Sequence, residues 1–315
     1  MIPTPFQNAL VLTGPTGSGK TALGVELAER LGAEIVSMDS MALYRGMDIG
    51  TAKPGPEERR RVRHHLIDVL DPWESASVAW WLQRAAECCL EIEARGKRAL
   101  FVGGTPLYLK ALLCGLFDGP AADQNVRRRL TEEADRSGRR ALHDRLATID
   151  PVTARRLHPN DVRRVIRALE VWELTGRPIS AWQSQWCAAA DSPPATAEGG
   201  PRTTEPVLWL DVPREELYDQ INARVRQMIA DGLVEEGRAL RRLPRPLSKQ
   251  AAQALGYQEV FDHLDGRATL EETVVRIQTR SRNFAKRQLT WFRQLRECQP
   301  ATRELTFRLW GLTID

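Results

Sequence analysis

One glycine-rich stretch constrains this chain of 315 residues more than any other feature. It reads Gly-Pro-Thr-Gly-Ser-Gly-Lys-Thr at 14–21, after an apolar run at 9–13 and before helical spacing at 22–31. Strand, glycine loop and helix form the context in which the pattern G-x-x-x-x-G-K-[ST] cradles phosphate groups. The glycines let consecutive backbone N–H groups face one concavity, and the helix N-terminus adds partial positive charge. The chain is therefore predicted to bind a di- or triphosphate.

All eight residues of this phosphate loop are candidate phosphate ligands: Gly14, Pro15, Thr16, Gly17, Ser18, Gly19, Lys20 and Thr21. The Lys20 ammonium can reach terminal phosphate oxygens, and the Thr21 hydroxyl is placed to bind Mg²⁺. A loop of this kind stabilises a leaving diphosphate as readily as a transferring phosphoryl group. The loop alone therefore leaves the reaction open.

Composition narrows the setting in which the chain works. The formal net charge is +4, and none of the five cysteines forms a C-x-x-C pair, so neither a zinc site nor a disulfide framework is indicated. The N-terminus lacks a signal-peptide pattern, and no apolar run reaches membrane-spanning length. We expect a cytoplasmic monomer that does not contact a membrane.

Further apolar runs at 34–38, 64–69, 98–102 and 207–211 are predicted to be strands. Several of them end in Gly, Ser, Thr or Asp; a loop-like stretch at 44–54 follows the first, and helical spacing occurs at 22–31, at 76–95 and from about 106. This alternation is typical of an α/β fold, here a P-loop-type parallel sheet with flanking helices. We also predict a short strand within 305–312.

Differences in composition and in the spacing of apolar residues divide the chain into a core, an insertion and a loop. Residues 126–186 have helical spacing and contain 13 arginines against eight acids, which predicts an inserted all-helical domain at 119–186. The stretch 187–205 is small, polar and rich in Pro and Gly, so we predict a flexible loop. The catalytic core is then 1–118 together with 206–315, and its last helices form a basic surface.

Two polar residues follow predicted strands at the same sheet edge as the phosphate loop. Asp39 could be a general base beside the phosphates, or a helix cap or an indirect partner of a magnesium ion. Thr105 could likewise cap a helix or bind a leaving group. Position alone does not decide between these readings.

Basic residues cluster in two separate segments. Residues 276–296 carry seven basic residues and no acid, interleaved with aromatic residues. Arg163, Arg164 and Arg167 form a second cluster on a predicted helix. Either cluster could be a solvated helix face, but an uninterrupted basic face favours contact with a nucleic-acid backbone. RNA is favoured where a base must be presented to a buried site.

Seven motifs of this chain occur, in order, in the bacterial tRNA dimethylallyltransferases, which the sequence resembles from about 9 to 296. They are Gly-Pro-Thr-Gly-Ser-Gly-Lys-Thr (14–21), Ser-Met-Asp-Ser (37–40), Gly-Met-Asp-Ile-Gly-Thr-Ala-Lys-Pro (46–54), Val-Gly-Gly-Thr-Pro-Leu-Tyr (102–108), His-Pro-Asn-Asp (158–161), Arg-Arg-Val-Ile-Arg-Ala-Leu-Glu (163–170) and Ala-Lys-Arg-Gln-Leu-Thr-Trp-Phe-Arg (285–293). The resemblance implies dimethylallyl diphosphate as donor and N6 of adenosine 37, in the tRNA anticodon stem-loop, as acceptor.

The resemblance also implies roles for single residues. Asp39 would take the N6 proton, while Thr105, Lys20 and Arg224 would hold the diphosphate with Mg²⁺. The residues implied to contact tRNA are Asp39, Ser40, Met41, Ala42, Thr105, Arg127, Arg163, Arg164, Val165, Ile166, Arg167, Lys286, Arg287 and Arg293. The family often has a basic residue after Gly-Tyr, whereas Gln258 stands here.

Three alternatives use the same phosphate loop. A small-molecule or nucleotide kinase would leave the basic segment 276–296 without a role. An isopentenyltransferase for free adenine nucleotides would have no need of the insertion's arginines. A non-catalytic RNA-binding ATPase would turn over no allyl donor.

Overall fold

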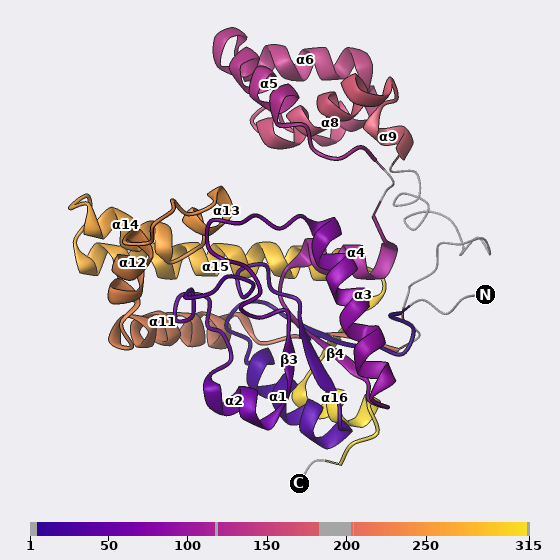
Figure 1. Ribbon diagram of the computed structural model, residues 1–315, viewed down its shortest axis with the longest axis vertical. Coiled ribbons are helices and arrows are strands. Elements are labelled where there is room, and N and C mark those ends of the chain that lie inside the picture. Colours follow the sequence, from indigo (N-terminus) through magenta and orange to yellow (C-terminus); the bar gives the residue numbers. More distant parts are fainter. Residues whose placement is uncertain (1–4, 117–118, 183–202, 204, 314–315) are drawn as a thin grey trace. The chain divides into compact units, whose positions relative to one another are not determined.

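The computed structural model describes residues 5–116, 119–182, 203 and 205–313, and its backbone divides into two compact units (Figure 1). One unit combines Met1–Leu113 with Pro201–Asp315, and the other is Cys114–Gly200. The second unit is thus inserted into the sequence of the first. The loop predicted at 187–205 lies almost entirely outside the described residues.

A parallel six-stranded sheet forms the centre of the first unit in the described part of the chain. Its strands are β1 (Leu10–Thr13), β2 (Glu34–Ser37), β3 (His64–His65), β4 (Ala99–Gly103), β5 (Val207–Leu210) and β6 (Cys298–Ala301). Their spatial order is β3-β2-β4-β1-β5-β6, and every neighbouring pair is parallel. The prediction of a parallel α/β sheet is confirmed.

The central strands are almost entirely apolar because both faces of the sheet are covered. Leu12 of β1 lies opposite Val102 of β4 and Leu208 of β5, and every residue of these three strands is buried. Parallel pairing brings the carboxyl ends of β1, β2 and β4 to one edge of the sheet. Ligands of open α/β sheets bind beyond that edge.

Some helices of the first unit cover the sheet, and others pack on one another. The helices of this unit are α1 (Lys20–Leu31), α2 (Pro56–Arg61), α3 (Val78–Ala94), α4 (Pro106–Cys114), α11 (Arg214–Ala230), α12 (Leu233–Arg241), α13 (Lys249–Ala252), α14 (Tyr257–Leu264), α15 (Leu270–Gln294) and α16 (Arg303–Leu309). Of these, α11, α12, α14 and α15 pack on one another, and the long helices α11 and α15 lie side by side (Figure 1). Both carry residues that reach the carboxyl edge of the sheet.

The described residues of the second unit form a separate helical core. Its helices are α5 (Gln124–Ser137), α6 (Arg139–Ile149), α7 (Pro151–Arg156), α8 (Val162–Thr175) and α9 (Ile179–Trp182). Leu130, Leu146 and Leu169 are fully buried between them. The Asp150 carboxylate accepts hydrogen bonds from the backbone N–H groups of Thr153 and Ser180, both at 2.9 Å, and so joins α7 to α9.

Two strand predictions were wrong in detail. The predicted strand within 305–312 is occupied by helix α16, whose first turn is capped by the hydroxyl of Thr302. The sixth strand is β6, which the sequence hides because it lies at the sheet edge and contains Pro300. The predicted strand 64–69 shortens to β3, since Leu66 and Asp68 have φ of 58° and 57°.

In the described part of the chain, no helix is long and apolar enough to cross a membrane.

Candidate active site

The phosphate loop lies between β1 and α1, as the sequence predicts. Gly17 and Gly19 have φ of 86° and 78°, a backbone conformation that favours glycine. A Cβ atom on Gly17 would lie 2.6 Å from the Cγ1 atom of Ile221. Helix α11 therefore packs so closely against the loop that a side chain at position 17 would not fit.

Two cationic side chains reach the loop from different elements. The Lys20 ammonium donates to the carbonyl of Pro15 at 3.2 Å, and the Arg224 guanidinium donates to the Thr16 hydroxyl. The Oγ atom of Ser18 and the Nε atom of Arg224 are buried without a hydrogen-bond partner among the described residues. Buried polar atoms normally have partners. This arrangement indicates a site for an anionic group.

Burial lowers the pKa of both cations. It lowers the pKa of the Lys20 ammonium to about 8; the nearby Asp39 carboxylate opposes this shift, and Arg224 adds to it. Burial also lowers the pKa of Arg224, again against the attraction of Asp39. Lys20 is therefore still mostly protonated at neutral pH, but it loses its proton at a lower pH than an exposed lysine would.

This shift predicts how phosphate binding depends on pH. Below about pH 8 Lys20 is charged, and above it the free protein must take up a proton to bind an anion. We expect the affinity for inorganic pyrophosphate to fall by up to about tenfold for each pH unit above 8. Calorimetric titration from pH 6.5 to 9.5 measures this. Lys20→Arg is the control, because a guanidinium keeps its proton and should remove the decline. An equal decline in both proteins would contradict the assignment.

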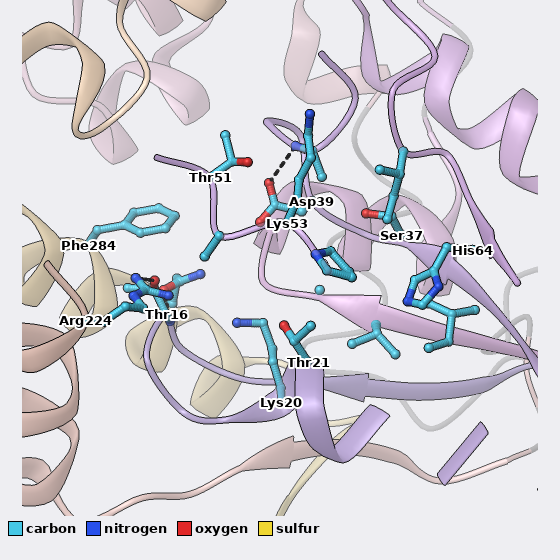
Figure 2. Close-up of a pocket in the computed structure, with 18 residues that line it drawn as sticks. Thr16, Lys20, Thr21, Ser37, Asp39, Thr51, Lys53, His64, Arg224 and Phe284 are labelled. Atoms are coloured by element: carbon cyan, nitrogen blue, oxygen red, sulfur yellow. Dashed lines mark hydrogen bonds between the residues drawn. The ribbon is translucent and has the colours of Figure 1, made fainter. Parts of the chain in front are cut away.

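Asp39 lies two residues after the end of β2 and faces the same cleft as Lys20 and Arg224 (Figure 2). Its Oδ1 atom accepts from the backbone N–H of Met41 at 2.8 Å, which orients the carboxylate. The other oxygen has no hydrogen-bond partner among the described residues. A Cβ atom on Gly103 would lie 2.3 Å from the backbone of Met38, so glycine lets β4 approach this turn. Asp39 is thus an oriented carboxylate with one oxygen available.

Thr105 lies beside Asp39 but is not among the residues that line the cleft. Its backbone N–H donates to the Met38 carbonyl at 3.2 Å, and its hydroxyl accepts from the N–H of Ser40 at 3.0 Å. In this structure Thr105 therefore holds the turn that carries Asp39.

Charged and apolar side chains line the cleft together. Figure 2 shows Thr16, Arg224 and Phe284 on one side, Ser37 and His64 on the other, and Lys20 and Thr21 between them. The apolar residues along it are Ile35, Ala42, Ala52, Pro54, Ile67, Val102 and Phe284. Such a cleft suits a ligand that carries both a phosphate group and a small hydrocarbon group.

Residues 46–54 form a loop that is held by buried charge, and its last part, 51–54, forms one wall of the cleft. The ammonium of Lys53, whose side chain is only 1% exposed, donates to Asp48 at 2.7 Å and to Asp68 at 2.6 Å. Ala52 adopts a φ of 52°, which is uncommon for a residue with a side chain. Lys53 therefore shapes the wall, and its donors are already used.

Glu236 of α12 fixes the same loop from outside. Its carboxylate accepts from the backbone N–H groups of Asp48, Ile49 and Gly50 at 2.9, 2.9 and 3.1 Å. The Tyr257 hydroxyl donates to it at 2.6 Å. The sequence did not single out Lys53, Glu236 or the cleft-lining Gln288 of α15. The sequence pattern that could have indicated these three residues is a charged or amide side chain at a position that is expected to point into the protein.

The residues present fit a magnesium ion that is held mainly by a bound diphosphate. Thr21, the predicted Mg²⁺ ligand, lines the cleft together with Asp39. The described residues contain no group of three or more His, Cys, Asp or Glu side chains that could hold a metal ion. Mg²⁺ commonly uses one or two protein oxygens and takes its other ligands from water and substrate phosphates.

Two arginines predicted to contact tRNA are paired within the helical unit. Arg127 and Arg167 donate to the carboxylate of Glu170 at 2.9 and 2.6 Å. Burial alone would raise the pKa of Glu170, but hydrogen bonds from both arginines hold it below its ordinary value. This buried acid fixes the direction of both guanidinium groups.

The remaining predicted residues of α8 separate into two kinds. Arg163 and Arg164 are exposed. Val165 and Ile166 are buried in the core of the helical unit, with 1% and 8% of their surface exposed. The side chains of Val165 and Ile166 therefore do not face solvent, because these positions form the inward face of α8.

The basic face of α15 is partly neutralised. Arg276 and Arg280 form ion pairs with Asp262 and Glu259 of α14. Lys286, Arg287 and Arg293 are exposed and have no acidic partner among the described residues. The unneutralised charge is therefore concentrated in the C-terminal half of α15.

The fold and the site define an α/β protein of the P-loop type with an oriented carboxylate in the same cleft as the phosphate loop. The chain belongs to the IPP transferase family, whose model matches residues 42–295. A model of the isopentenyl transferases also matches residues 7–69.

Relatives and solved structures agree with this assignment. The chain is 48% identical over 285 residues to a tRNA dimethylallyltransferase of Geobacter metallireducens, covering 90% of this chain and 89% of that protein. It is similar to the crystal structure of a full-length tRNA isopentenylpyrophosphate transferase from Bacillus halodurans, with 40% identity, a TM-score of 0.64 and coverage of 97% and 94%. A eukaryotic dimethylallyltransferase acting on tRNA has 26% identity, a TM-score of 0.73 and coverage of 91% and 70%.

Proposed function

We propose that this protein transfers a dimethylallyl group from dimethylallyl diphosphate to N6 of adenosine 37 in tRNA and releases diphosphate. The observation that carries the proposal is one cleft in which Lys20, Arg224 and Asp39 lie together with apolar side chains. A phosphorylated hydrocarbon donor matches that combination. Family membership supports the same reaction.

Binding of the donor follows from the charge in the cleft. The diphosphate lies against the phosphate loop, where Lys20 and Arg224 neutralise it, and the allyl group lies against the apolar side chains that line the cleft. The two atoms now without partners, Ser18 Oγ and Arg224 Nε, gain a phosphate oxygen as acceptor. Thr21 would contribute to Mg²⁺ binding, and the ion would supply further neutralisation of the leaving group.

Asp39 supplies the proton acceptor. The N6 lone pair of adenine forms a bond to C1 of the allyl group, and the C1–O bond breaks with its electrons leaving on diphosphate. An adenine amine is a weak nucleophile because its lone pair is delocalised into the ring. The proton of N6 passes to the free oxygen of Asp39, which prevents positive charge from building up on the base.

We propose the exposed basic residues of α15 and of the helical unit as contacts to the tRNA backbone. Replacing Arg287 by Ala should weaken binding of an anticodon stem-loop and lower the slope of log affinity against log salt concentration by about 1. Fluorescence anisotropy at several salt concentrations measures the slope. Arg276→Ala on the same helix is the control, since Asp262 lies 3.9 Å from that guanidinium and offsets part of its charge. An unchanged slope in Arg287→Ala would remove α15 from the RNA contact.

The reaction is tested by incubating the protein with Mg²⁺, radiolabelled dimethylallyl diphosphate and an anticodon stem-loop that contains adenosine 37. Label should enter this RNA and should be absent when guanosine replaces adenosine 37. Free adenosine monophosphate serves as a second acceptor. Labelling of the mononucleotide in preference to the RNA, or phosphorylation of a small acceptor by ATP without any allyl transfer, would overturn the proposal.

A further inference from the structure

Gln288 of α15 connects two loops of the active site through both ends of its side-chain amide. The residue is 2% exposed and lines the cleft. Its Oε1 atom accepts from the backbone N–H of Thr16 at 2.8 Å, and its Nε2 atom donates to the carbonyl of Gly104 at 2.6 Å. Thr16 belongs to the phosphate loop, and Gly104 lies between β4 and α4. A single buried side chain therefore fixes the distance between these loops.

The surroundings leave little room for adjustment. A Cβ atom on Gly104 would lie 2.6 Å from Nε2 of Gln288. Thr16 is held a second time, because its hydroxyl accepts from Arg224 of α11. Backbone and side chain of one phosphate-loop residue are thus bound by two packed helices. A glutamine that served only to fill the core would not need hydrogen bonds to both the phosphate loop and the turn after β4.

We infer that Gln288 is a positioning residue for the donor diphosphate. By holding Thr16 it sets the part of the phosphate loop that meets Arg224, and by holding Gly104 it sets the start of the turn that leads to Thr105. The amide is required because it is a donor and an acceptor at once, at a reach that asparagine lacks. This inference deepens the proposed function and rests on it for the identity of the donor.

The test replaces Gln288 by Met, which keeps the length and apolar volume but removes both hydrogen bonds. Gln294→Met, near the exposed end of the same helix, is the matched control. Three quantities are measured in each variant: the dissociation constant of inorganic pyrophosphate, the kcat and donor KM of transfer, and the dissociation constant of the stem-loop. Urea unfolding reports stability separately.

In Gln288→Met we expect pyrophosphate to bind about 10-fold more weakly or worse, because a backbone donor and acceptor lose their partners. The kcat should fall and the donor KM should rise, while stem-loop affinity stays within about twofold. Gln294→Met should match the wild type in every quantity. Pyrophosphate affinity equal to that of the wild type would overturn the inference, as would equal losses of donor and RNA affinity, which mark a general structural role.

A second variant keeps the inference testable if Gln288→Met does not fold. Gln288→Asn retains the amide but is one methylene shorter, so it should also weaken pyrophosphate binding. Failure of the proposed function gives a different pattern. The wild type would then transfer no allyl group, yet Gln288→Met would still bind pyrophosphate more weakly than Gln294→Met.

Discussion

Replacing Asp39 by Asn is expected to lower kcat by about 10²- to 10⁴-fold, the usual contribution of a positioned general base. The amide oxygen can still accept from the N–H of Met41, so the turn after β2 should keep its shape. What is lost is a group that takes the N6 proton as the C–N bond forms. Single-turnover transfer of a radiolabelled allyl group to a stem-loop measures this step, and RNA affinity should change by no more than about twofold.

The control for this variant is Asp211→Asn. Asp211 directly follows β5 and is exposed, and it is not among the residues that line the cleft. It should transfer the allyl group at the wild-type rate. A wild-type rate in Asp39→Asn would remove Asp39 from the role of base. A large loss of RNA affinity in Asp39→Asn would instead assign Asp39 to binding.

Lys20→Met should have the second large effect, a loss of about 10²- to 10³-fold in kcat/KM for the donor at pH 7. The ammonium is the charge nearest the start of α1, and removing one group that stabilises developing negative charge costs about that much. Because Lys20 is the group whose pKa is lowered to about 8, the variant should also lose the decline in pyrophosphate affinity above that pH. Steady-state kinetics with varied donor concentration measure the loss.

Lys249→Met on α13 is the comparison for Lys20→Met, since Lys249 is exposed and lies outside the cleft. Its kinetics should equal those of the wild type. If Lys20→Met changed the RNA KM and left the donor KM unchanged, the phosphate loop would be a contact for the RNA backbone.

The parts of the fold that depend on neighbouring residues could be predicted. The phosphate loop lies where its glycine spacing predicts it. Strands β1, β2, β4 and β5 lie within the predicted apolar runs, and short apolar runs of this kind are typical of buried parallel strands. Strand β6 could not be predicted, because an exposed edge strand with a proline carries no apolar alternation. Helix α16 was mistaken for a strand because Leu305 and Phe307 alternate over a short apolar stretch.

The parts of the site that depend on distant pairs could not be predicted. Gln288 and Thr16 are 272 positions apart, and Glu236 is 188 positions from Asp48. In a single sequence nothing links such residues, so only the folded chain reveals that helices of the C-terminal half hold loops of the N-terminal half. Arginine clusters were visible in the sequence, whereas their pairing with Glu170 or Asp262 was not.

The most direct test of the account is a crystal structure of the protein with a non-reactive thio analogue of dimethylallyl diphosphate and an anticodon stem-loop. We predict that the diphosphate contacts Lys20 and Arg224, and that N6 of adenosine 37 lies about 2.6–3.2 Å from the free oxygen of Asp39. Adenosine 37 bound outside the cleft, or a diphosphate bound away from the phosphate loop, would contradict the account.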